Sequence, residues 1–316
     1  MPDYQMFGGI LRSELDLLEL APCGGPPPRW TLTRAERPAV ATNVQPLGTE
    51  PVDPGVTVTL SRADGFFRLV YTDTGTFDIS ADGSRIRWTP PHGVNLDAAR
   101  KDVLGRVLAV CLELQHVATL HGSAVQLADD GVAFLAPKFH GKSTTAAALV
   151  DRGARLLADD LVAVTDHDHP HVLPAVPVVQ LWNDSAERVG RIDASQRGFG
   201  GSPKAQIGWD ADSRNAAEPV PFAAVYLLAP FAPSGARRVR REQLPHFAAT
   251  LALLGQTKIG ALLGPAWRGA LLERLSRLAS LVPVYRLEVP RDYARLDELT
   301  DALMSWHEAV PALAEA

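Results

Sequence analysis

The chain has 316 residues, of which 46% are hydrophobic and 21% charged, a composition typical of soluble globular proteins with one large core or two unequal domains. Its formal net charge of -5 argues against a nucleic-acid partner, because neutralising phosphates requires a surplus of Lys and Arg. The most apolar segment, 103–120, contains charged side chains and does not suit a membrane span. Cys23 and Cys111 lie in unrelated patterns, which favours free thiols, and the N-terminus lacks a secretory signal. We therefore expect a cytoplasmic protein with no membrane partner.

The first hundred residues contain short runs with strand character, separated by turns. Strands are predicted within 4–20 and over 56–60, 66–71, 76–80 and 85–88. Asp64-Gly65 and Asp82-Gly83 are dipeptides that favour hairpin turns. The Pro- and Gly-rich run at 22–28 should hold no regular element, because proline lacks a donor and glycine is entropically costly to order. We expect a β-rich module over residues 1–98.

The remainder alternates between helix and strand patterns, which predicts an α/β domain over 99–316. Helices are predicted at 97–120, 243–254, 265–281 and 296–308, and strands at 123–127, 132–135, 155–158, 161–164, 223–229 and 284–289. Asp129-Asp130-Gly131 should join two of these strands in a hairpin. The loop with His167, Asp168, His169 and His171 favours a solvated turn over a metal site, because its spacing matches no tetrahedral ligand set. The polar, Gly-rich segment 191–221 is predicted to be a mobile loop.

A phosphate-binding loop is predicted where the strand at 132–135 runs into Gly141-Lys142-Ser143-Thr144 and an alanine-rich helix. Lys142 would contact the β- and γ-phosphates, and the Ser143 hydroxyl would help to hold Mg²⁺. Ala136 stands where a Walker-type loop has its first glycine. The alternative is an ordinary helix that begins Gly-Lys-Ser. The predicted nucleotide-binding residues are Ala136, Pro137, Lys138, Phe139, His140, Gly141, Lys142, Ser143 and Thr144.

Asp159 and Asp160 follow the next predicted strand. Two adjacent carboxylates repel each other, and a cation beside them relieves that cost. One could hold Mg²⁺ while the other accepts the proton of an attacking hydroxyl; a solvated Asp-Asp turn is the alternative. His121 begins the strand upstream and could hydrogen-bond a carboxylate or phosphate, although a structural histidine is the commoner case.

These segments together resemble the HPr kinase/phosphorylase family. The resemblance is carried by His121-Gly122-Ser123-Ala124-Val125, the Asp-Asp-Gly turn, the loop at 136–144, and 152–160, RGARLLADD. A branch of related serine kinases, including lasso-peptide precursor kinases, is similar over most of the chain. That similarity extends to the Leu-Trp-x-Asp-Ser segment at 181–185 and the strand at 282–287.

The resemblance implies a P-loop kinase core of the HPr kinase/phosphoenolpyruvate-carboxykinase type, with ATP and Mg²⁺ as cofactors. It implies phosphoryl transfer to a serine hydroxyl of a peptide or small protein, such as a natural-product precursor peptide. His121, Lys142, Asp159 and Asp160 fall on active-site positions, with Asp160 as proton acceptor and Asp159 and Ser143 as metal ligands, although the two aspartates could exchange roles. The sequence leaves a homo-oligomer open.

This chain departs from the family pattern at several places. Ala136 and Phe139 replace loop glycines, and a side chain there restricts the left-handed backbone that lets amides surround an anion. The Arg-Gly-Leu-Gly signature of the bifunctional enzymes is absent after 175, which argues against phosphorylase activity. Lys204, Arg214 or Lys258 could supply a further cation. Two alternatives stay open: a kinase of a small-molecule hydroxyl, and a nucleotide-binding sensor or scaffold without catalysis.

Overall fold

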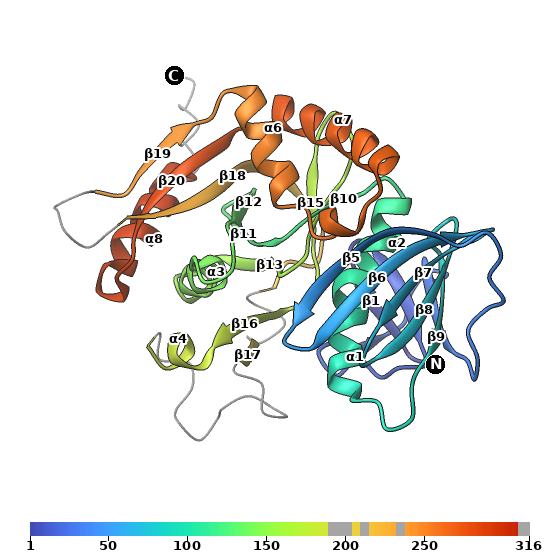
Figure 1. Cartoon of the computed structure of the whole chain (residues 1–316). Coiled ribbons are helices and arrows are strands. Elements are labelled where there is room, and N and C mark those ends of the chain that lie inside the picture. The colour runs from blue at the N-terminus through green and yellow to red at the C-terminus, as the bar shows by residue number, and fades with distance from the viewer. Residues whose placement is uncertain (189–203, 209–214, 232–237, 309–316) are drawn as a thin grey trace.

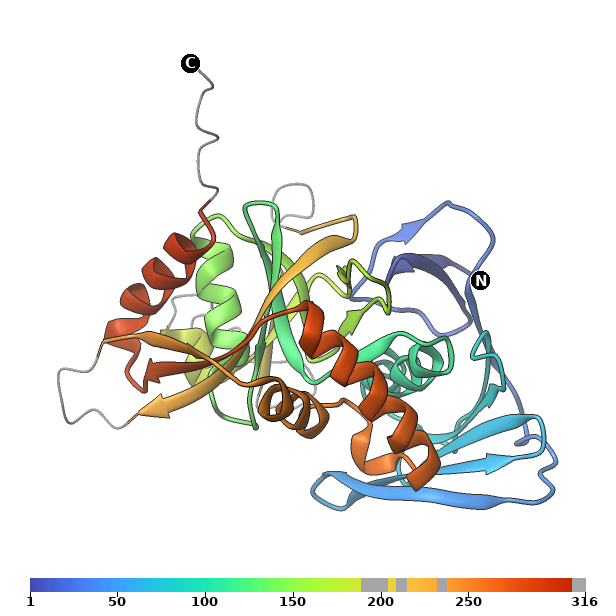
Figure 2. The same cartoon turned by 90° about the horizontal axis from the view of Figure 1, so that it is seen from above.

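The computed structural model describes residues 1–188, 204–208, 215–231 and 238–308 (Figure 1). Within these ranges it is a mixed α/β protein with two nine-stranded sheets and a small two-stranded one. Seen from above, the strands of residues 1–89 form a layer at one end of the molecule, and the second sheet with its helices fills the other end (Figure 2).

All strands of the first sheet come from residues 3–89, in the spatial order β3-β1-β2-β4-β9-β8-β7-β6-β5. The predicted strands are confirmed, and Gly65 and Gly83 turn their hairpins with φ of 82° and 70°. The prediction for 22–28 is wrong at its start, because Pro22–Cys23 pairs with β1 as a short edge strand. The strands are β1 (Asp3–Met6), β2 (Gly9–Ser13), β3 (Pro22–Cys23), β4 (Trp30–Arg34), β5 (Gln45–Asp53), β6 (Val56–Ala63), β7 (Phe66–Tyr71), β8 (Gly75–Ser80) and β9 (Arg85–Thr89).

The helix predicted over 97–120 is shorter and interrupted. It consists of α1 (Leu96–Asp102), a π-helical turn η1 (Val103–Val107) and α2 (Leu108–Leu114), and then gives way to β10 (Ala118–Leu120). Gly105 causes the interruption, with non-helical φ of -100° and ψ of -106°. The apolar run continues past the helix because all three residues of β10 are buried, so spacing alone could not mark the boundary.

The second sheet has the order β10-β14-β15-β18-β12-β11-β13; β20 also pairs with β18, and β19 pairs with β20. The predicted hairpin is confirmed by antiparallel β11 and β12, in which Gly122 faces Leu135. On its other edge β12 runs parallel to β18, which in turn runs parallel to β20. The remaining strands are β11 (Gly122–Leu127), β12 (Asp130–Leu135), β13 (Arg155–Asp159), β14 (Val162–Val164), β15 (His171–Leu173), β18 (Val220–Phe231), β19 (Arg240–Gln243) and β20 (Val284–Pro290).

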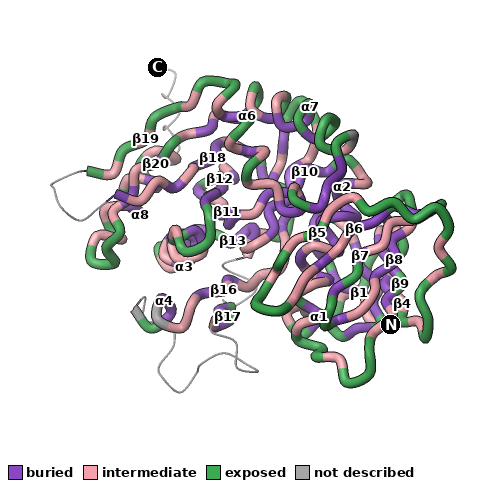
Figure 3. The backbone as a smooth tube through the Cα atoms, viewed as in Figure 1, coloured by how far each residue is buried: buried purple, intermediate pink, exposed green. Residues whose placement is uncertain are grey.

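Helices cover both faces of this sheet, and the alternation along β12 shows why. Val132 and Phe134 join the core shared with α3 (Lys142–Asp151) and α8 (Leu296–Trp306). Ala133 and Leu135 join the core shared with α6 (His246–Gly255), α7 (Pro265–Leu281) and the first sheet. Buried segments accordingly run through the central strands of both sheets (Figure 3). No described helix is long and apolar enough to cross a membrane.

The segment predicted as a mobile loop, 191–221, contains regular structure. β17 (Lys204–Gly208) pairs with β16 (Val178–Trp182) as the small sheet, and β18 begins at Val220. Polar composition misled the prediction here, because β17 is short and only Ala205 and Ile207 on one of its faces are buried. Residues 189–203 and 209–214 lie outside the described part of the chain. The short helices are α4 (Asn183–Arg188), η3 (Gly260–Leu262) and η4 (Tyr293–Arg295).

Candidate active site

The segment from Ala136 to Ser143, here the 136–143 loop, connects the end of β12 to α3 and includes the first two residues of that helix. Gly141 precedes the helix in the left-handed conformation, with φ of 86°, and no side chain caps the helix. The first amides of a helix have no intrahelical acceptor, and the helix dipole is positive there. The loop and the start of α3 therefore form a place where an anion can bind. Pro137, Lys138 and Phe139 are exposed, and Thr144 is half-buried in the first turn of α3.

Phe139 shows how the loop tolerates a replaced glycine. Its φ is 68°, so it adopts the left-handed backbone that the glycine would supply. The residue is 65% exposed, but its ring stacks on that of Trp182, with ring centroids 5.0 Å apart. The stack offsets part of the cost of a left-handed phenylalanine. His140 follows and directs Nδ1 to the Lys138 carbonyl at 2.8 Å.

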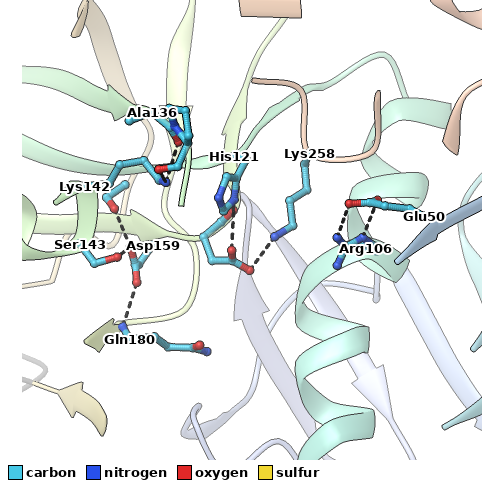
Figure 4. A network of polar contacts seen from close by, with 12 residues as sticks. Glu50, Arg106, His121, Ala136, Lys142, Ser143, Asp159, Gln180 and Lys258 are labelled. Atoms are coloured by element: carbon cyan, nitrogen blue, oxygen red, sulfur yellow. Dashed lines mark hydrogen bonds and ion pairs between the residues drawn. The ribbon is translucent and has the colours of Figure 1, made fainter. Parts of the chain in front are cut away.

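Lys142 folds back over the loop (Figure 4). Its Nζ donates to the carbonyl oxygens of Ala136 at 2.7 Å and Pro137 at 3.1 Å. Burial lowers the pKa of this ammonium to about 8, and the charge of Asp159 opposes that shift. The Lys142 ammonium is thus held beside the first residues of the loop, close to the place where an anion would bind.

Asp159 ends β13 and collects three donors from three elements. The hydroxyls of Ser123 and Ser143 donate to its Oδ1 at 2.6 and 2.9 Å, and the Gln180 amide donates to its Oδ2 at 2.8 Å. Burial raises the pKa of this carboxyl, although the hydrogen bonds oppose the shift. A buried carboxylate whose ionisation is disfavoured gains from a nearby cation. Asp159 and Ser143 therefore provide neighbouring oxygen ligands of the kind Mg²⁺ prefers.

Asp160 belongs to a second, separate set of contacts. His121 Nδ1 lies 3.2 Å from Oδ1, and Lys258 Nζ lies 2.6 Å from Oδ2. Burial acts to raise the pKa of this carboxyl, but Lys258 and His121 outweigh it and hold the pKa well below its usual value. The side chain is still 40% exposed, so a substrate hydroxyl can reach it. Its backbone is left-handed, with φ of 69°, and this reversal directs the two neighbouring aspartates to different partners.

His121 and Lys258 are brought to Asp160 by pairing at the edge of the second sheet. The His121 amide donates to the Gln256 carbonyl at 2.6 Å, Leu120 forms a bridge with Thr257, and the Lys258 amide donates to the Thr119 carbonyl at 3.1 Å. The segment after α6 is therefore fixed to β10. The Lys258 side chain is only 6% exposed.

Among the three cations considered as candidates, Lys258 is the one that the structure brings to the aspartates. Lys204 lies over the ring of Trp182, with Nζ 5.4 Å from the centroid, and Arg214 lies outside the described residues. Asp168, in the loop after β14, pairs with Arg277 of α7 at 2.8 Å. Within the described ranges, no three His, Cys, Asp or Glu side chains gather as a metal site.

Comparison of the sequence with curated proteins finds matches to one group of enzymes. The chain is 34% identical to the HPr kinase/phosphorylase of Lactobacillus delbrueckii subsp. bulgaricus over 84 residues, and 37% identical to that of Lactobacillus acidophilus over 75 residues. The chain is related to HPr kinase/phosphorylases. The alignments cover 27% and 24% of this chain, and the chain spans only 27% and 23% of the length of these two relatives. No family model matches the chain.

A solved HPr(Ser) kinase/phosphatase, from Coxiella burnetii, aligns with 60% of this chain and 96% of its own at 13% identity. The TM-score of 0.33 is too low for that likeness to support any argument. The relation to HPr kinase/phosphorylases therefore depends on the two sequence matches.

Sequence reasoning did not single out Ser123 or Gln180 as partners of Asp159. Ser123 lies directly opposite Asp159 in the antiparallel pair of β11 and β13, so the strand register could have identified it. No local pattern marks Gln180, because its backbone amide makes the contact and any residue type supplies one.

Proposed function

We propose that this protein is an ATP- and Mg²⁺-dependent kinase that phosphorylates a serine hydroxyl of a peptide or small protein. The observation that carries the proposal is the hydrogen bond from Ser143, at the start of α3, to Asp159, beside a second carboxylate held apart from it. P-loop kinases need this combination: a loop serine and an acidic residue beside the nucleotide phosphates, and a separate group facing the acceptor. The names of the two curated relatives support a kinase.

In this mechanism the amides at the start of α3 bind the phosphates and Lys142 neutralises their charge. Ser143 and Asp159 are the residues that would hold Mg²⁺, whose charge would offset that of the phosphate oxygens. Asp160 orients the acceptor hydroxyl and takes its proton. Its low pKa makes it a weak base, but phosphoryl transfer has a loose transition state, in which positioning contributes more than base strength.

The replaced glycines were the reason to consider a non-catalytic sensor. Phe139 already has the left-handed backbone, and the Ala136 carbonyl serves as an acceptor for Lys142. The replacement at Phe139 therefore does not prevent the loop from curling, which removes one reason to prefer the non-catalytic sensor.

The test is phosphoryl transfer from γ-labelled ATP, with Mg²⁺, to a panel of serine-containing peptides that includes the peptide encoded nearest the gene. We expect labelled product with the wild type. Asp160→Asn should lower kcat by about a hundredfold or more while nucleotide affinity is retained. Asp168→Asn, a change at an exposed aspartate that pairs with Arg277, is the control.

Failure of the wild type to label any peptide, together with Mg²⁺-independent nucleotide binding, would overturn the proposal. Nucleotide binding without turnover would instead support a sensor. Labelling of small alcohols but not peptides would support a small-molecule kinase.

A further inference from the structure

A chain of charged side chains leads from Asp160 out of the second sheet and into the first. Lys258 pairs with Asp160. Figure 4 shows Arg106, of the π-helical turn η1, on the element next to Lys258. Arg106 in turn pairs with Glu50 of β5 through two hydrogen bonds, Nη2 to Oε1 at 2.8 Å and Nε to Oε2 at 3.2 Å. Glu50 therefore connects the predicted N-terminal module to the candidate active site.

The backbone of the same strand supports the segment that carries Lys258. A Cβ at Gly48 would lie 2.6 Å from the Ala261 carbonyl oxygen and 2.8 Å from the Leu262 Cα. β5 therefore packs directly on the backbone of η3, immediately after Lys258. β10 holds this segment on its other side.

The charges of Arg106 and Glu50 both act on the ammonium of Lys258. Arg106 is a second cation near the buried ammonium of Lys258, and two unscreened cations repel each other. Burial is the main cause that lowers the pKa of Lys258, and Asp160 opposes it; Arg106 adds to the lowering, and Glu50 acts against it. The side chains of Arg106 and Glu50 are 19% and 25% exposed, so solvent screens the pair only partly.

We infer that Glu50 and Arg106 are positioning residues for the kinase reaction: the N-terminal module holds Lys258 against Asp160 through this ion pair. The inference builds on the proposed function and extends the active site to a strand that contributes no catalytic residue. Glu50 compensates the charge of Arg106 and fixes its guanidinium through two hydrogen bonds. Lys258 then keeps the carboxylate of Asp160 oriented toward the acceptor.

The first test compares kinetics. Glu50→Gln should lower kcat by about tenfold and leave KM for ATP within about twofold, because a displaced general base affects the transition state more than nucleotide binding. Glu50→Asp, which keeps the charge, should recover part of the loss. The matched control is Asp53→Asn, since Asp53 lies on the same strand and pairs with Lys101 of the neighbouring helix at 3.1 Å, with both side chains more than half exposed.

A double-mutant cycle tests whether Glu50 acts through Lys258. In a Lys258→Met background, Glu50→Gln should cause no further loss of kcat. An equal tenfold loss in both backgrounds, or no loss in the wild-type background, would overturn the inference. Arg106→Lys, which keeps the charge but not the paired hydrogen bonds, replaces Glu50→Gln if that variant does not fold.

A second readout does not depend on activity. Lys258 should react slowly with an amine-acetylating reagent in the wild type, because it is buried and ion-paired, and about tenfold faster in Glu50→Gln. Peptide mass spectrometry would measure the acetylation rate of Lys258, with the exposed Lys138 as the reference. If the wild type transfers no phosphate, the proposed function fails, and the labelling still decides this inference: equal rates in the wild type and Glu50→Gln would overturn it.

Discussion

Nucleotide affinity should depend on pH through Lys142. Burial lowers the pKa of its ammonium to about 8, against the opposing charge of Asp159. Bound phosphate favours the charged form, so nucleotide binding takes up a proton when the solution pH is above this pKa. The affinity for nucleotide is therefore close to its maximum at about pH 7 and decreases progressively above about pH 8. From about pH 7 to pH 9 it should fall about tenfold, which corresponds to about 1.4 kcal/mol.

Titration calorimetry with ADP, which is not turned over, measures this in buffers of different ionisation enthalpy. The heats should show that binding takes up nearly one proton per nucleotide at about pH 9, because the solution pH is then about one unit above the pKa of the amine. Lys142→Arg is the matched control, because a guanidinium stays charged throughout this range. A flat profile in the wild type, or the same tenfold fall in the arginine variant, would refute the role of Lys142.

Three further predictions concern the loop and the fold. Phe139→Gly should leave ADP affinity within about threefold, because the backbone is already left-handed, whereas Phe139→Val should weaken it in the same calorimetric assay. Arg274→Met leaves buried Glu113 without its cation and should cost about 3–5 kcal/mol in urea unfolding, most of it regained when Glu113→Gln is added. Burial raises the pKa of Asp102 from 3.8 to about 7, so its contribution to stability is present at low pH and lost as pH rises to about 7. Asp102→Asn should accordingly raise the melting temperature more at about pH 8 than at pH 5, and an equal rise at both would contradict the assignment.

The sequence predicted those parts of the fold that depend on local chemistry. The hairpin turns at Gly65 and Gly83 and the helix start at Pro265 were found because each is encoded within a few residues. β4 and β5 were missed. β4 runs parallel to β2 and β9 in the centre of the first sheet, and such pairing leaves no local turn signal. β5 contains two prolines, which its position at the sheet edge permits.

The candidate site divides in the same way. Lys142, Ser143 and the aspartate pair could be proposed from spacing, because the loop and the helix start are contiguous. Lys258 could be named only as one of three cations, since it is 98 residues from Asp160 and reaches it through sheet-edge pairing. Glu50 had no signal at all, because its importance follows from a contact between the first sheet and the π-helical turn η1, 56 residues away in the chain.

The position of β12 has a consequence for the order of folding. Its antiparallel neighbour β11 is adjacent in the chain, but its parallel neighbour β18 begins only at Val220. During synthesis on the ribosome, the strand that leads into the 136–143 loop remains paired on one side until residues 220–231 have emerged. Contacts this distant in the chain form slowly. The proposed nucleotide site would therefore be complete only late in translation, after the residues of the first sheet have emerged.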